Sequence, residues 1–137
     1  MRCLLLALAL LRPILALAQT PREALLDRTD NAASWQLNPG PEFPGADGAV
    51  SLASDPTRGP CLRLDYDFTG GGNYVTASRE LAVGQATEVL FCVRQEGANR
   101  GFVRIADASG QEHMGSFLAA NDWQRVRLRL DPQDFPG

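Results

Sequence analysis

Residues 61–81, CLRLDYDFTGGGNYVTASREL, carry the clearest strand and turn pattern of this chain. Its first half alternates between apolar and charged residues, and the apolar set is Leu62, Leu64, Tyr66 and Phe68. This period of two predicts a strand with one dry face and one solvated face. Three glycines at 70–72 then permit a backbone reversal before a second extended run, which begins at Tyr74. We therefore predict a β-hairpin with a glycine-rich tip, which lets either a neighbouring loop or a ligand approach closely.

Short extended runs, separated by turns rich in glycine and proline, continue along the rest of the chain. They fall at 49–53, 87–94, 102–106, 111–118 and 123–130. Both faces of the run at 87–94 are apolar, which predicts a strand placed centrally in a sheet. The run at 123–130 instead carries arginines on one face and aliphatic residues on the other. Residues 107–110, reading DASG, predict a tight hairpin turn.

No amphipathic helix is evident after the first eighteen residues. Short strands at regular spacing, with glycine and proline in the turns, are typical of all-β sandwiches. The jelly-roll form suits the pattern because it protects the sheet edges and offers a concave face. We therefore predict an all-β fold, a two-sheet antiparallel β-sandwich of jelly-roll type.

The N-terminus has the order of a secretory signal peptide. Arg2 precedes an apolar run, and Ala16-Leu17-Ala18 supplies small residues before the expected cleavage site. We predict a signal peptide at 1–18, a linker at 19–24 and a β-sandwich domain at 25–137, in a secreted or periplasmic protein. We also expect a final strand or a following domain beyond residue 137.

Charge and cysteine content exclude some classes of function. The chain has a formal net charge of −3 and contains no lysine. It therefore lacks the basic tract that phosphate binding requires, and we expect no nucleic-acid partner. No apolar stretch after the signal is long enough to cross a bilayer, so we expect no membrane partner. Cys61 and Cys92 remain after export, which fits either a disulfide between them or two buried free thiols.

Four runs together resemble the galactose-binding-like jelly-roll domain. They are LRLDYDFTGGGNYV from residue 62, FCVR from 91, FVRIADASGQEH from 102 and NDWQRVRLRL from 121. More narrowly they resemble the ancillary carbohydrate-binding modules of secreted bacterial glycoside hydrolases, in which an acidic first strand and a later Trp correspond to Leu25-Leu26-Asp27 and Trp35. The resemblance implies a non-catalytic module that binds polysaccharide or oligosaccharide, as the N-terminal part of a longer polysaccharide-degrading protein. The strand that usually closes the family's domain, often with an acidic residue near a structural metal, is not present in this chain.

Ligand contacts are expected from aromatic and polar side chains, because a flat ring buries the apolar face of a sugar. Tyr74 lies just after the glycines, following Asn73, and is our candidate for stacking, whereas Tyr66 and Trp123 are expected in the core. The predicted ligand-binding residues are Tyr74, Asn73, Arg104 and Arg127.

A row of arginines at every second position gives a second candidate surface. Its members are Arg125, Arg127 and Arg129, and Arg63, Arg79 and Arg104 are candidates to join them. One interpretation is a solvated face balanced by Asp65 and Asp67 through cross-strand pairs. The other is a concave face that binds a carboxylated or sulfated polysaccharide through bidentate arginine contacts.

Catalysis is not expected on this chain. His113 is the only histidine, and no nucleophile is spaced to use it. Asp65 and Asp67 lie on one strand face and cannot flank a glycosidic bond. No cofactor is predicted, although structural calcium is an option that Asp27, Asp30 or Asp107 would serve, with Asp27 the candidate ligand. Two alternatives stay open: a fragment of a glycoside hydrolase whose catalytic domain lies beyond residue 137, and a structural or protein-binding β-sandwich without glycan affinity.

Overall fold

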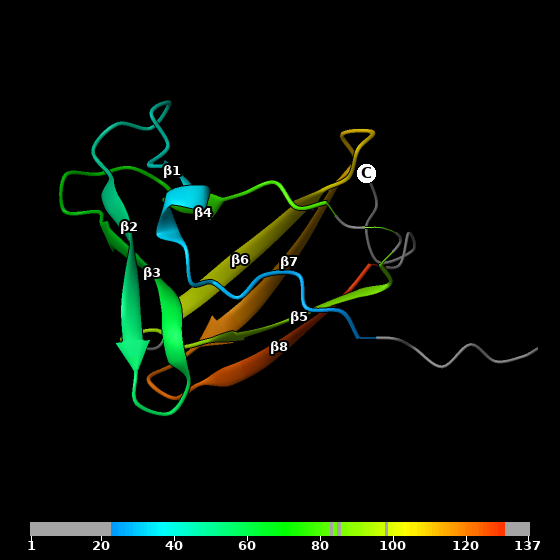
Figure 1. Ribbon diagram of the computed structural model, residues 1–137. Coiled ribbons are helices and arrows are strands. Elements are labelled where there is room, and N and C mark those ends of the chain that lie inside the picture. Colours follow the sequence, from blue (N-terminus) through cyan, green and yellow to red (C-terminus); the bar gives the residue numbers. More distant parts are fainter. Residues whose placement is uncertain (1–22, 83, 85, 98, 131–137) are drawn as a thin grey trace, which may run out of the picture. The chain divides into compact units, whose positions relative to one another are not determined.

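The computed structural model describes residues 23–82, 84, 86–97 and 99–130 (Figure 1). The predicted signal peptide, most of the predicted linker and the end of the chain after residue 130 lie outside these residues. The described chain contains one 3-10 turn, η1, and eight strands. Their bounds are η1 Ala32–Ser34, β1 Gln36–Asn38, β2 Asp47–Asp55, β3 Gly59–Asp67, β4 Thr76–Ser78, β5 Glu88–Val93, β6 Asn99–Ala106, β7 Glu112–Ala119 and β8 Gln124–Arg129.

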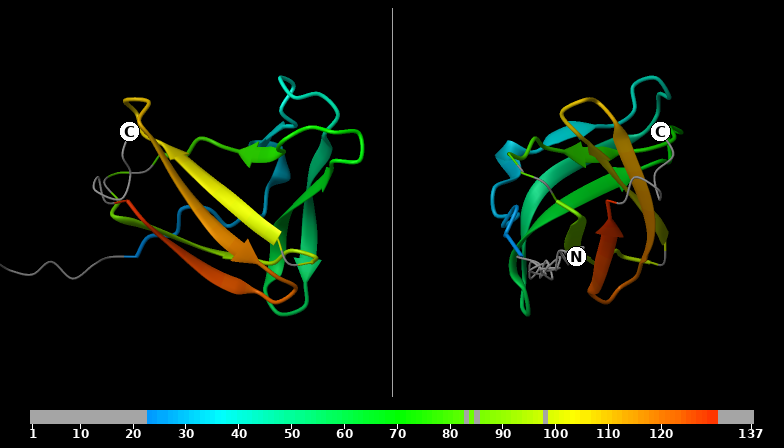
Figure 2. Two further views of the ribbon diagram at one scale, coloured as in Figure 1. Left: turned by 180° about the vertical axis from the view of Figure 1, so that it is seen from behind. Right: turned by 90° about the vertical axis from the view of Figure 1, so that its right-hand side faces the viewer.

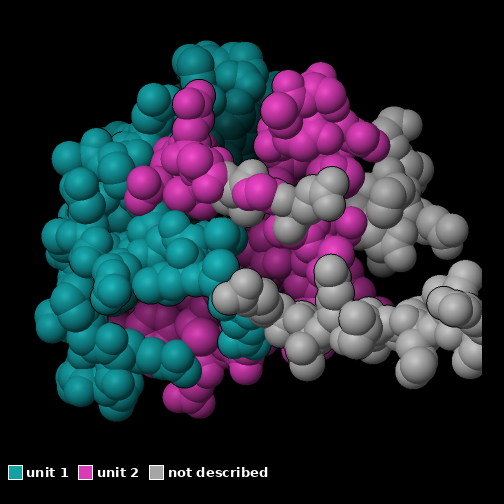
Figure 3. Space-filling model, turned by 45° about the vertical axis from the view of Figure 1, so that its right-hand side comes forward, with its two compact units in different colours: residues 1–77 teal, residues 78–137 magenta. Residues whose placement is uncertain are grey.

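The described residues form an all-β structure of antiparallel strand pairs, as predicted. Four two-stranded sheets join β1 with β4, β2 with β3, β5 with β8, and β6 with β7. The chain divides into two compact units, residues 1–77 and 78–137 (Figure 3). The packing of two sheets into a jelly-roll sandwich stays a prediction.

In the first unit, β2 and β3 pair along their whole length, from Asp47 opposite Asp67 to Asp55 opposite Gly59. The turn between them is built on the carboxylate of Asp55, which is only 5% exposed. Its Oδ1 accepts hydrogen bonds from the Thr57 amide at 2.9 Å, the Thr57 hydroxyl at 2.6 Å and the Arg58 amide at 3.0 Å. Gly59 completes the turn with a φ of +77°, a conformation that favours glycine.

The predicted hairpin spanning 61–81 is wrong. The partner of β3 is β2, which precedes it, and the segment after the glycines contributes β4 to a sheet with β1 instead. The physical reason is that the three-residue turn capped by Asp55 lies at the N-terminal end of β3 and joins it to β2, so the hairpin closes before β3 and not after it. The glycine stretch therefore connects two sheets.

The glycines approach a neighbouring loop, which is one of the two options left open by the sequence. A Cβ built on Gly45 would lie 2.0 Å from the Gly70 carbonyl oxygen, and one built on Gly72 would lie 2.4 Å from the Ala46 Cβ. Gly45 also has a φ of +115°. Glycine is thus required here for contact between two backbones.

In the second unit, β5 lies beside β8 and β6 beside β7 (Figure 2). The predicted turn between β6 and β7 is confirmed, because the Gly110 amide donates to the Asp107 carbonyl at 3.0 Å and the Asp107 amide to the Gln111 carbonyl at 2.9 Å. The alternation in β8 is also confirmed, with its arginines exposed and Val126 and Leu128 half-buried. The central position predicted for β5 is wrong, since β8 is its one strand partner within the described residues.

Glycines also make room for large side chains inside the second unit. A Cβ on Gly115 would lie 2.3 Å from a methyl carbon of Leu128, and one on Gly101 would lie 2.4 Å from the ring of Phe117. Phe117 in turn meets Phe91 edge-on, with ring centroids 5.4 Å apart. These contacts place β5 and β8 against the inner face of the β6–β7 hairpin.

Replacing Gly45 by Ala should destabilise the protein, because the new methyl group meets the Gly70 carbonyl and the backbone holds a positive φ. We expect a loss of about 1–3 kcal/mol in the free energy of unfolding, measured by urea titration. Gly84→Ala is the matched control, since no atom lies within 4 Å of a Cβ built there. Equal stability of the two variants would contradict the backbone contact.

Candidate functional site

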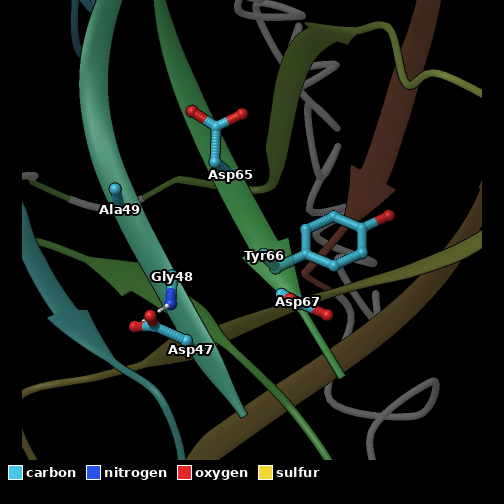
Figure 4. A pocket seen from close by; sticks show the side chains of 6 residues that line it. All are labelled: Asp47, Gly48, Ala49, Asp65, Tyr66 and Asp67. Atoms are coloured by element: carbon cyan, nitrogen blue, oxygen red, sulfur yellow. Dashed lines mark hydrogen bonds between the residues drawn. The ribbon is translucent and has the colours of Figure 1, made fainter. Parts of the chain in front are cut away.

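An open cleft of about 250 Å³ lies at one end of the β2–β3 hairpin (Figure 4). Three residues from each strand line it: Asp47, Gly48, Ala49, Asp65, Tyr66 and Asp67. Figure 4 shows Asp65 and Tyr66 leaving β3 in different directions, as neighbours on a strand must. The cleft therefore combines carboxylates with one aromatic side chain.

The carboxylates of Asp47 and Asp67 belong to residues that face each other across the hairpin. Like charges in directly opposed positions destabilise a strand pair unless other groups accommodate them. Here each carboxylate accepts hydrogen bonds from its own strand end. Asp47 Oδ1 accepts from the Gly48 amide at 2.7 Å, and Asp67 accepts from the Thr69 amide at 2.8 Å and the Thr69 hydroxyl at 3.0 Å. Both side chains are thereby fixed at the cleft by backbone donors.

Hydrogen bonds from Thr69, through its amide and its hydroxyl, hold the pKa of Asp67 below its ordinary value. Asp65 is also charge-compensated, because the Arg63 guanidinium lies 2.7 Å from its Oδ1 on the same strand. With three carboxylates and one arginine, this end of the hairpin has an acidic character. It suits hydroxyl donors or cations rather than anions.

Tyr66 and Phe68 form an exposed aromatic pair at the same end of β3. The two side chains are 41% and 42% exposed, and their ring centroids lie 5.6 Å apart at an interplanar angle of 46°. The prediction that Tyr66 belongs to the core is therefore wrong. On the apolar face of β3, Leu62 and Leu64 are half-buried. Tyr66, the next residue on this face, is exposed.

Tyr74, the predicted stacking residue, is half-buried and holds the loop that precedes β2. Its hydroxyl donates a hydrogen bond to a carboxylate oxygen of Glu42, and its ring meets Phe43 edge-on with centroids 6.4 Å apart. A Cβ on Gly40 would lie 3.2 Å from the Tyr74 ring. Asn73 beside it is exposed. Tyr74 thus has partners within the first unit and is half-buried, whereas Tyr66 and Phe68 are exposed.

Arg104 and Arg127, the other predicted ligand residues, lie in the second unit on two different sheets. Arg104 on β6 pairs with Glu112 at 3.5 Å, and Arg127 on β8 lies 3.7 Å from Glu88. Within the second unit, Glu88 is thus a cross-strand partner of Arg127 and Arg129, and pairing of the row with Asp65 and Asp67 stays a prediction. A single site that includes Tyr74 and these arginines stays a prediction.

The remaining candidates have local roles in the structure. Trp35 and Trp123 are half-buried, and the Arg94 guanidinium lies 5.4 Å from the Trp123 ring centroid. His113 is half-buried on β7, opposite Ile105. Cys61 is half-buried on β3 and Cys92 exposed on β5, in separate units, so a disulfide between them stays a prediction.

The predicted calcium ligands act as turn caps. Asp27 Oδ1 accepts from the Thr29 amide at 2.6 Å, and Asp107 Oδ1 accepts from Ser109 and Gln111 amides at 2.8 and 3.0 Å. Within the described ranges, no three acidic, histidine or cysteine side chains are grouped to hold a metal. Calcium binding stays a prediction.

Sequence reasoning did not select Asp47 or the exposed pair Tyr66 and Phe68. Their exposure could have been inferred from their position next to loop residues, where the side chains of a strand are commonly exposed to solvent. Asp47 also required knowledge that β2, and not the segment after the glycines, pairs with β3.

Comparisons with known proteins find no matching family model, no matching curated protein and no matching solved structure. In the part of the chain that the structure describes, no helix has the length and apolar character needed to span a membrane.

The hydrogen bond from Tyr74 is the main reason that the pKa of Glu42 lies below its ordinary value. In Tyr74→Phe, the pKa of Glu42 should therefore rise toward that of an ordinary carboxyl, as followed by carboxyl-detected NMR titration. The pKa of Asp67, which depends on Thr69, serves as the internal control and should not move. An unchanged Glu42 pKa would show that this hydrogen bond is absent in solution.

The same lowered pKa values predict how stability depends on pH. Asp67 and Asp107 titrate below their ordinary values because they accept hydrogen bonds in the folded state. Their stabilising contribution is therefore complete above the ordinary pKa of an aspartate and is lost as the pH falls through the lowered folded-state values. Urea midpoints should decline as the pH is lowered below about 4, the ordinary pKa of an aspartate. In Asp67→Asn this decline should be shallower.

Proposed function

We propose that this chain is a secreted or periplasmic, non-catalytic carbohydrate-binding module for neutral glycans, with its site at the Tyr66 end of the β2–β3 hairpin. The observation that carries the proposal is the exposed pair of Tyr66 and Phe68, at the end of the hairpin that also carries the carboxylates of the cleft on its other face. The all-β architecture and the likeness of the sequence to galactose-binding-like modules support it.

The chemistry of the site fits a sugar without charge. An exposed aromatic ring can cover the apolar C–H face of a pyranose, and burial of that face supplies most of the free energy. Asp65 and Asp67 project from the other face of β3 than Tyr66, so they can accept hydrogen bonds only from sugar groups that extend past the end of the hairpin. The same carboxylates repel sulfates and uronic acids, which favours neutral glycans at this cleft.

A binding role is supported over hydrolysis by the arrangement of the acids. Asp65 and Asp67 project from one strand, and Asp47 lies directly across from Asp67. A glycosidase needs two carboxyls on opposite sides of the scissile bond. The proposed contribution of this module is therefore to concentrate an attached polysaccharide-degrading enzyme at its substrate.

Tyr66→Ala should weaken binding to a neutral oligosaccharide by about 1–3 kcal/mol, because it removes the stacking surface. Isothermal titration against a panel of neutral glucans, mannans, xylans and galactans would measure this. Phe102→Ala is the matched control, since Phe102 is another exposed aromatic side chain on a different sheet. The affinity of Phe102→Ala for the same oligosaccharide should equal that of the unmodified protein.

Two results would overturn this proposal. One is an absence of binding to every neutral glycan of the panel at millimolar concentration. The other is equal loss of affinity in Tyr66→Ala and Phe102→Ala, which would place the contact elsewhere.

A protein-binding β-sandwich is the second candidate function, and one observation favours it. The outer face of the β6–β7 hairpin exposes Phe102, Met114 and Leu118 together, all of them more than half exposed. Apolar groups gathered on one face commonly mark an interaction surface. Failure of the glycan panel would leave this role as the leading one.

A further inference from the structure

The exposed face of β8 carries an uninterrupted row of arginines. Arg125, Arg127 and Arg129 alternate with residues that are half-buried, so all three guanidiniums lie on one side of the strand. The side chains of Arg127 and Arg129 are 57% and 70% exposed. Successive members of such a row are about 7 Å apart, because a strand rises by 3.2–3.4 Å per residue.

The charge of this row is only partly offset within its own sheet. Glu88 on β5 lies opposite Arg129, and its two carboxylate oxygens are 3.7 Å from Nε of Arg127 and 3.7 Å from Nε of Arg129. Two guanidiniums therefore share one carboxylate at long distance. Both keep donors directed to solvent, since each guanidinium has five N–H groups.

The rest of this face is uncharged. Leu90 and Cys92 lie opposite Arg127 and Arg125 in the antiparallel register. The face formed by the paired residues of β5 and β8 thus holds three arginines and a single acid. It is locally basic in a chain whose formal net charge is −3.

We propose that this arginine row is a second binding site, one that takes an anionic polysaccharide with regularly spaced sulfate or carboxylate groups. The planar guanidinium pairs with such groups through two parallel hydrogen bonds. Individual exposed ion pairs are weak, but a polymer engages several members of the row at once and gains by multivalency. The proposal concerns another unit, another sheet and a ligand of opposite character to the cleft at Tyr66, so it does not depend on the proposed function.

A polysaccharide is favoured over single-stranded nucleic acid by the composition of the face. Proteins that bind single strands combine basic side chains with aromatic rings on which the bases stack. None of the six paired residues on this face is aromatic: they are Glu88, Leu90, Cys92, Arg125, Arg127 and Arg129. The row offers charge and hydrogen-bond donors only.

The test compares two double variants that remove the same charge from the same unit. Arg127→Gln/Arg129→Gln changes the row, and Arg100→Gln/Arg104→Gln changes the exposed face of β6 on the other sheet. Binding of dextran sulfate and of polygalacturonate to the whole chain would be measured at low and high salt. The row variant should bind about tenfold more weakly at low salt, and the β6 variant should bind like the unmodified protein.

Glu88→Gln provides a test in the opposite direction. Removing the one acid of the face should tighten binding of both polymers several-fold, which a loss of folding cannot produce. Tyr66→Ala should leave polyanion binding unchanged, which separates this site from the neutral-glycan cleft.

Three outcomes would overturn the proposal. Equal weakening in the two double variants would show attraction by overall charge alone. Unchanged or weaker binding in Glu88→Gln would show that the face is not the contact. Binding of a single-stranded oligonucleotide as tight as that of dextran sulfate, and equally sensitive to the row variant, would assign the row to nucleic acid.

Discussion

The carboxylate of Asp55 is the constraint on which the first unit depends. One buried oxygen accepts three hydrogen bonds and so fixes the turn that aligns β2 with β3. A shift of one residue in that register would send every side chain of one strand to the opposite face. The positions of Asp47 opposite Asp67, and of Ala49 opposite Asp65, follow from this alignment. The composition of the cleft is thus set by a turn at the far end of the hairpin.

Glycine has a different task in each unit of this chain. At Gly45 and Gly70 two loops meet backbone to backbone, so the loop before β2 and the stretch after β3 hold each other in place. At Gly101 and Gly115 the missing side chains admit Phe117 and Leu128. Among the described residues, Ala119 is the one buried apolar residue, so these close contacts supply much of the packing that a larger core would provide.

The charged groups pair locally, which keeps the two candidate surfaces electrostatically distinct. Arg63 neutralises Asp65 along one strand, and Glu88 is shared by two arginines across one pair of strands. Neither interaction cancels the net charge of the surface on which it lies. The Tyr66 end of the β2–β3 hairpin stays acidic and the exposed face of β8 stays basic, and the two proposed binding sites rest on this difference in charge.

Much of the fold follows from local pattern alone. Alternation in β8, the Asp107–Gly110 turn and the all-β class were predictable because strand periodicity and turn chemistry act between near neighbours in sequence. Strand pairing was not, since nothing in residues 61–81 distinguishes a partner before β3 from one after it. The partner was selected by the Asp55 turn. The exposure of Tyr66 and the engagement of Tyr74 by Glu42 also required the tertiary structure, because burial depends on which distant segment covers a side chain. Local pattern thus fixes which residues alternate and where the chain turns, whereas the pairing of strands and the exposure of Tyr66 and Phe68 depend on contacts between segments far apart in the chain.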